Sequence, residues 1–324
     1  METSLQYSLG TTGSTILPGS DDTGALGFPG EVTENYFGTR NYLNLARDMS
    51  AVNRKAFHMT STKGVPLVYH CRFTVIRPLE DDNDVLTYVA VGGAQENWVT
   101  RNASVKLHYA REKMFQNAGI RKSERGRYDK TIRLNYDSRS QTWTLPILTD
   151  NNSLFTDIGE WDVSKIAIDE DTDLTPCLFG SVMNEEAAIN GDTFNIQNAY
   201  LNSRRAPEQD EGDDEGSAPH SIIRSLFNVE DAIDDEVQAI AQDNQDMTPY
   251  DHDGIAGSFT SVSLKGFSLM GATGGTIVQT FDVDIPFGIC EVVTVKQTQD
   301  DSNSDMEGTV PLLVEVLGIS EMQG

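Results

Sequence analysis

Apolar and polar residues alternate along two long stretches of the chain. In residues 67–76 one apolar face is formed by Leu67, Tyr69, Cys71, Phe73 and Val75. In residues 276–289 the corresponding face is formed by Phe281, Val283, Ile285, Phe287 and Ile289. Successive side chains of a strand point to opposite faces of its sheet, so this period of two predicts two strands that each bury one face in a common core.

Shorter patterns of the same kind predict further strands. They lie at residues 85–91, 131–136, 141–148, 160–168, 192–197, 258–270, 290–295 and 310–319. In the second of these we expect the inward side chains to be Ile132, Leu134 and Tyr136. The acidic residues 80–84 predict a turn, so we expect 67–76 and 85–91 to pair as a hairpin.

Many short strands and few helices are typical of an all-β fold. We expect a jelly-roll β-sandwich with eight or more antiparallel strands in two sheets, one short helix and long loop insertions. The helix is predicted where apolar residues recur at helical spacing, in Val105, Tyr109, Ala110, Met114 and Phe115. We expect Thr100 or Asn102 to cap its start and Gly119 to end it.

Composition divides the chain into an arm and one large domain. Residues 1–39 are rich in Gly, Ser and Thr and contain no Lys or Arg, which predicts a flexible N-terminal arm. Residues 40–324 then form the sandwich domain, with an acidic surface insertion at about 204–254.

Charge is distributed very unevenly along the chain. The 324 residues carry a net charge of −26, yet residues 101–139 contain 11 Lys and Arg against four acids. A basic patch on an acidic body attracts polyanions, whereas the rest of its surface repels them. We therefore predict a nucleic-acid-binding surface formed by Arg101, Lys106, Arg111, Lys113, Arg121, Lys122, Arg125, Arg127, Lys130 and Arg133. The alternative for such a run is a solvated, charged helix and turn.

The sequence offers few groups for catalysis or metal binding. Its five histidines match no catalytic or metal-binding spacing, so we expect no enzymatic activity. Cys71, Cys177 and Cys290 are widely spaced and predict buried, reduced thiols. We expect no cofactor; the alternative is a loose calcium site at residues 169–173 or at Asp251 and Asp253. No stretch is apolar enough to span a membrane and the first residues lack the pattern of a secretory signal, so we expect no membrane partner.

Several segments resemble capsid proteins of small circular single-stranded DNA viruses known mainly from environmental sequences. They are residues 98–136 and, in the same order, WDVSKIA, LNSRRAPEQDE and TPYDHDGIAG, and together the likeness covers about half of the chain. The resemblance implies a single jelly roll that assembles with copies of itself into an icosahedral shell. It also implies a location in the virion, with packaged single-stranded DNA as a non-specific partner.

One feature departs from that family. Many such coats carry an Arg-rich N-terminal arm, whereas residues 1–39 here contain no basic residue. Either residues 101–139 take over contact with the genome, or the shell binds its genome weakly. The alternative function is a non-enzymatic β-sandwich binding module for carbohydrate or calcium, extracellular or on a virion surface.

The acidic insertion gives a first testable prediction. Residues 208–215 contain six acids and are flanked by Gly and Pro, which predicts an exposed loop on the outside of a particle. Limited proteolysis of intact particles should therefore cleave there first, as mass spectrometry of the fragments would show. Protection of this segment, with cleavage elsewhere, would place it inside the shell or at a subunit contact.

Overall fold

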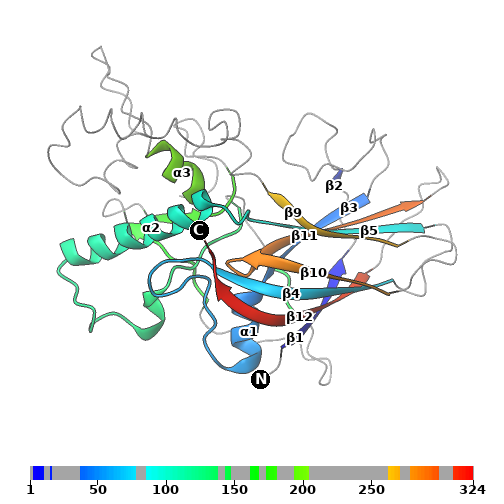
Figure 1. The fold of residues 1–324 in the computed structure, drawn as a ribbon, viewed down its shortest axis with the longest axis horizontal. Coiled ribbons are helices and arrows are strands. Elements are labelled where there is room, and N and C mark those ends of the chain that lie inside the picture. The colour runs from blue at the N-terminus through cyan, green and yellow to red at the C-terminus, as the bar shows by residue number, and fades with distance from the viewer. Residues whose placement is uncertain are drawn as a thin grey trace, which may run out of the picture.

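The computed structural model describes eleven stretches of the chain, drawn as coloured ribbon in Figure 1. They are residues 3–10, 15–16, 37–77, 85–137, 143–146, 161–167, 173–180, 193–203, 262–270, 278–298 and 309–323. The expected acidic insertion at 204–254, including 208–215, lies outside the described residues. So do Asp251 and Asp253 and residues 169–172 of the alternative calcium sites.

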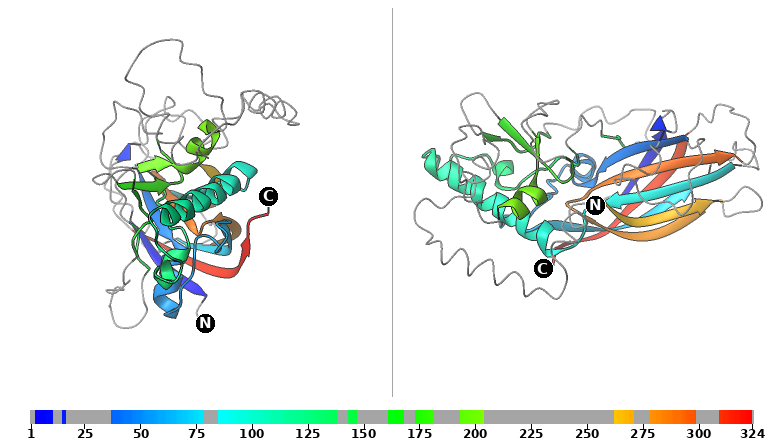
Figure 2. Two further views of the ribbon diagram at one scale, coloured as in Figure 1. Left: turned by 90° about the vertical axis from the view of Figure 1, so that its left-hand side faces the viewer. Right: turned by 90° about the horizontal axis from the view of Figure 1, so that it is seen from above.

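Two antiparallel sheets form most of the described structure. The first has the order β1 (Ser4–Gly10), β12 (Thr309–Glu321), β4 (Leu67–Ile76) and β10 (Val278–Pro286). The second has the order β2 (Thr15–Ile16), β3 (Phe37–Asn44), β11 (Ile289–Thr298), β5 (Val85–Gly93) and β9 (Ser263–Met270). Figures 1 and 2 show the two sheets as facing layers of a sandwich. The predicted all-β sandwich is confirmed.

The remaining elements are short or lie between β5 and β9. A small third sheet contains β6 (Ile166–Ala167), β7 (Asp173–Cys177) and β8 (Thr193–Asn195). The helices are α1 (Leu45–Asn53), α2 (Trp98–Asn117), α3 (Ile196–Asn202) and the 3-10 helix η1 (Arg127–Lys130). Everything described between Ala94 and Ser203 therefore belongs to one long insertion between two neighbouring strands.

The predicted core is present between the sheets. Tyr69, Cys71, Phe73, Val75, Val283, Ile285 and Phe287 are at most 5% exposed. Leu67 and Phe281 are partly buried and pack against the same cluster. Both long alternating patterns therefore gave the correct buried face, because each lies on a strand with one side against the opposite sheet.

Strand pairing is nested along the chain. β1 pairs with β12, β3 with β11, β4 with β10, and β5 with β9, each pair antiparallel. The first half of the fold is thus matched to the second half in reverse order. The turn of this long nested hairpin falls between β5 and β9, where the insertion leaves the sandwich.

The predicted hairpin of 67–76 with 85–91 is wrong. β4 lies between β12 and β10 in one sheet, whereas β5 lies between β11 and β9 in the other. Two strands that follow one another in the sequence therefore lie in opposite layers of the sandwich. The local turn signal could not reveal this, because both strands pair with segments about 200 residues further along the chain.

The expected flexible arm is wrong for its first residues. Ser4–Gly10 pair along their whole length with β12, and Leu5, Tyr7 and Leu9 are buried. Residues 1–39 as a whole are rich in Gly, Thr and Ser, and this average composition obscured the alternating apolar residues Leu5, Tyr7 and Leu9. The end of the same range, from Phe37, belongs to β3.

Other predicted strands are shorter than expected or absent. Residues 131–136 make one isolated bridge, from Asn135 to Cys177, although Ile132, Leu134 and Tyr136 are buried as expected. In the described part of 141–148, Trp143 makes one bridge to Tyr42. The strand predicted at 192–197 stops at Asn195, whose side chain caps α3 by accepting bonds from the Gln197 and Asn198 N–H groups.

The predicted helix is α2, which has 20 residues instead of being short and begins earlier than expected. The expectation of a single helix was wrong, because α1 and α3 are also present. Asn97 is the cap, because its side-chain oxygen accepts a 2.8 Å bond from the N–H of Thr100. Thr100 and Asn102, the expected caps, both lie inside the helix. Gly119 follows the last turn in the left-handed conformation, with φ of 73°, as its position predicted.

A two-residue corner connects the sheets. Phe287 and Gly288, both with positive φ, link β10 of one sheet to β11 of the other. The Phe287 N–H donates to the Leu67 carbonyl, and the Gly288 carbonyl accepts from the Leu45 N–H, each at 2.7 Å. A Cβ on Gly288 would lie 2.8 Å from the ring of Tyr69, so this position excludes a side chain.

Substitution at the corner should be much more damaging than at a comparable exposed glycine. Gly288→Ala combines left-handed strain with a clash against a buried ring, so we expect a loss of about 2–4 kcal/mol in unfolding free energy. Gly119→Ala is the matched control, because its φ is also positive but nothing lies within 4 Å of the added Cβ. Its loss should be about 1 kcal/mol. Equal losses in urea unfolding would contradict the proposed clash.

Candidate nucleic-acid interface

The basic segment forms a projection at one end of the sandwich. Figures 1 and 2 show α2 running away from the strands, with the following loop and η1 beside it. The helix is held by a narrow apolar face formed by Val99, Ala103, Leu107 and Ala110. Its N-terminal half also packs against α3, where Trp98 and Tyr200 meet edge to face. The C-terminal half and loop extend outward.

Two of the predicted DNA-binding arginines instead hold the loop on the helix. Arg125 binds Glu112 through two bonds of 2.5 and 2.8 Å, and its side chain is only 5% exposed. Arg111 pairs with the Asp129 carboxylate and also donates to its carbonyl. The two guanidinium groups lie over the ring of Phe115, at 4.5 and 5.0 Å from its centroid. We call Arg111, Glu112, Phe115, Arg125 and Asp129 the arginine clamp.

Two further cations of the predicted set contact neighbouring groups of the same chain. The Lys106 ammonium donates to the Ser203 hydroxyl at 2.8 Å and lies over the ring of Tyr200. The Arg133 guanidinium lies 4.5 Å from the centroid of Trp161. These contacts connect α2 and residues 131–136 to other parts of the insertion. Arg101 is half-buried near the start of α2.

Four more cations of the predicted set lie on the outside of the projection. Lys113, Arg121, Lys122 and Lys130 are exposed. Lys122 is 80% exposed, and its ammonium is 3.6 Å from the Glu112 carboxylate. Arg127 lies in η1. The predicted set of ten cations therefore includes residues that the fold uses internally, because Glu112 and Asp129 pair with Arg125 and Arg111 and do more than subtract charge.

The arginine clamp perturbs its central carboxylate. Hydrogen bonding from Arg125 lowers the pKa of Glu112 from 4.5 to about 2, against the opposing effect of partial burial. The positive charges of Arg125 and Lys122 contribute to the same shift. Glu112 is therefore ionised at any physiological pH, and the clamp stays closed. Exchanging Arg125 for an uncharged residue would leave this carboxylate without its main partner.

One exposed residue was placed wrongly by the helical pattern. Tyr109 was assigned to the apolar positions of the helix, but its side chain is 65% exposed. The face that packs is displaced toward Ala103, Leu107 and Ala110, whose small or aliphatic side chains allow close approach. Tyr109 instead lies on the solvent side, one helical turn before Lys113.

A polar ladder covers part of the outer face of the first sheet. His70 on β4 contacts Asp284 on β10 at 2.6 Å and Ser320 on β12 at 2.8 Å. The three groups have the order of a serine-hydrolase triad. However, Asp284 is 53% exposed, whereas a triad carboxylate is buried, and in the next row Arg72 pairs with Asp282 of the same two strands. The arrangement is a set of cross-strand pairs on an open sheet face.

Among the described residues, no group of three or more His, Cys, Asp or Glu side chains could hold a metal ion. The three cysteines are free and buried as predicted, and burial raises the pKa of each thiol. No helix in the described stretches is long and apolar enough to cross a membrane.

The chain matches no protein-family model, no curated protein and no solved structure.

The arginine clamp predicts a specific dependence of stability on pH. At neutral pH Glu112→Gln should lower the unfolding free energy by about 1–3 kcal/mol, because the nearly buried Arg125 loses its charged acceptor. The carboxylate stabilises the fold fully above its unfolded pKa of about 4.5, and this contribution disappears as the pH falls toward about 2. The difference between wild type and variant in urea unfolding should therefore shrink across this window.

A control separates the clamp from general loss of charge. Glu321→Gln removes a carboxylate from an exposed position at the end of β12. It should change stability by less than about 0.5 kcal/mol. The role assigned to Glu112 would be contradicted if the unfolding free energies of wild type and Glu112→Gln differed by the same amount at neutral and acidic pH.

Proposed function

We propose that this chain is a non-enzymatic capsid protein that assembles with copies of itself into a closed icosahedral shell around single-stranded DNA. Its place is in the virion. Exposed cations of the projection contact the packaged nucleic acid without sequence specificity, and no cofactor takes part.

The observation that carries the proposal is the nested strand pairing. Eight strands pair as first with eighth, second with seventh, third with sixth and fourth with fifth. This order is expected of a jelly roll, in which a long hairpin of two Greek keys is wrapped into two facing sheets. Jelly rolls are common in viral shells.

The charge distribution supports the same function. A chain of net charge −26 places several exposed cations on a single projection. A shell requires this division, because its inner surface must offset the charge of a polyanion while its other surfaces stay soluble. Lys and Arg contacts to phosphate gain free energy by releasing condensed counterions, and they need no particular sequence.

Exposed apolar side chains on an edge strand favour self-association. Leu264, Phe267 and Leu269 are exposed on β9, the end strand of its sheet, and Phe267 is 63% exposed. Apolar side chains gathered on an edge are typical of protein interfaces. In a homo-oligomer with closed symmetry the same surface is buried once in every subunit.

Electron microscopy tests the proposal. Purified protein at physiological salt should form uniform closed particles in negative stain, with absorbance at 260 nm from packaged nucleic acid. Monomers at all concentrations in size-exclusion chromatography would contradict a shell and favour a carbohydrate- or calcium-binding module. Phe267→Asp should reduce assembly without unfolding, because it places a charge on a surface that neighbours would bury.

A further inference from the structure

We propose that Tyr109, with Lys113 and Lys122 beside it, forms a stacking site for unpaired bases of single-stranded nucleic acid. This inference rests on the proposed function and deepens it. The bases stack on the phenol ring, and the lysines hold the adjoining phosphates.

The three side chains lie on one side of the projection. Tyr109 and Lys113 are four residues apart in α2, so their side chains are neighbours on the helix surface. Lys122 reaches the same surface from the loop, because its ammonium is 3.6 Å from Glu112, three residues after Tyr109. The arginine clamp keeps the loop in this place. An exposed aromatic ring is thus flanked by two exposed ammonium groups.

The helix surface that carries Tyr109 is fixed to the sandwich. The neighbouring His108 is buried, and its ring meets that of Tyr109 edge to face at 6.0 Å. The hydroxyl of Ser104, one turn earlier, donates a 2.7 Å bond to the Gly64 carbonyl. Gly64 also approaches His108 so closely that a Cβ there would lie 2.3 Å from the histidine side chain. A ring on this rigid support loses little conformational freedom when a base stacks on it.

The chemistry favours nucleic acid over an acidic protein surface. Carboxylates of a partner protein would be satisfied by the lysines alone and would gain little from a phenol ring. A single strand offers both a π-face in every base and a phosphate beside it, which matches an aromatic side chain between cations. Bases inside a duplex are already stacked, so the site selects single strands.

Phe267 provides the comparison within the same molecule. It is similarly exposed, but it lies on β9, where the side chain of the neighbouring cation Lys265 is only 13% exposed. An exposed aromatic ring without exposed cations should not bind DNA. Phe267→Ala is therefore the matched control for Tyr109→Ala.

The test uses two fluorescein-labelled 20-mers, oligo(dT) and an abasic strand with the same phosphates but no bases. Anisotropy titrations are made with the full chain at concentrations where size-exclusion chromatography finds unassembled subunits. Tyr109→Ala should weaken oligo(dT) binding about five-fold or more and leave abasic binding within two-fold. Tyr109→Phe and Phe267→Ala should bind both strands with the wild-type affinity in these titrations of unassembled subunits. Lys113→Gln with Lys122→Gln should weaken both strands and reduce the salt slope by about 0.7 per lysine.

Three outcomes would overturn the inference. Equal losses of Tyr109→Ala on both strands would show that the ring does not stack. If Tyr109→Ala bound DNA like wild type and still formed intact particles, Tyr109 would not contact nucleic acid, but the proposed shell function would be unaffected. Unchanged DNA binding with failed assembly, in a variant whose circular dichroism is native, would mean that Tyr109 contacts a second copy of the chain.

Discussion

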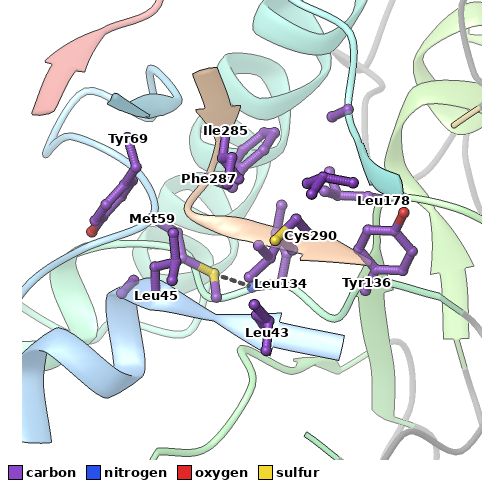
Figure 3. Packing of buried hydrophobic residues seen from close by; sticks show 14 of the residues in the cluster. Leu43, Leu45, Met59, Tyr69, Leu134, Tyr136, Leu178, Ile285, Phe287 and Cys290 are labelled. Atoms are coloured by element: carbon purple, nitrogen blue, oxygen red, sulfur yellow. Dashed lines mark hydrogen bonds between the residues drawn. The ribbon is translucent and has the colours of Figure 1, made fainter. Parts of the chain in front are cut away.

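The corner at Phe287 and Gly288 is the constraint on which the relation between the two sheets depends. Its backbone bonds reach the start of β4 and the start of α1, and the ring of Tyr69 closes against Gly288. Figure 3 shows Phe287 and Ile285 in the same cluster as Leu134 and Tyr136 of the insertion. The N–H of Leu134 donates to the sulfur of Met59 at 3.2 Å. The insertion therefore takes its position from the same core that joins the sheets.

Arginine has two roles in the basic segment. Guanidinium groups that reach back to carboxylates and aromatic rings give the projection its shape, whereas the cations that remain outside give it its charge. The division follows from chemistry, because a planar guanidinium can bind a carboxylate through two bonds and lie flat on a ring, and an ammonium can do neither. In the arginine clamp both cations are arginines. Of the four cations of the basic segment that the structure describes as exposed, three are lysines.

Sequence patterns predicted the features that depend on local geometry. Alternation found β4 and β10 with their buried faces, and residue types found the end of α2 at Gly119. Strand pairing could not be predicted from the sequence, because β4 and β5 are consecutive strands that join different sheets and pair with distant segments. The exposure of Tyr109 depends on which face of α2 meets the rest of the insertion. Arg125 binds Glu112 because the loop after α2 folds back onto the helix. No rule of residue spacing predicts that loop conformation.

The nested pairing also fixes the order in which the fold can be completed. β1 is synthesised about 300 residues before its partner β12, as the pairing of Ser4 with Glu315 shows. At about 5–20 residues per second the first strand waits roughly 15–60 s for that partner on the ribosome. During this time the apolar triplet Leu5, Tyr7 and Leu9 has no sheet to join. The N-terminal edge is therefore the last part of the sandwich to close, and the nascent chain is most prone to mispairing there.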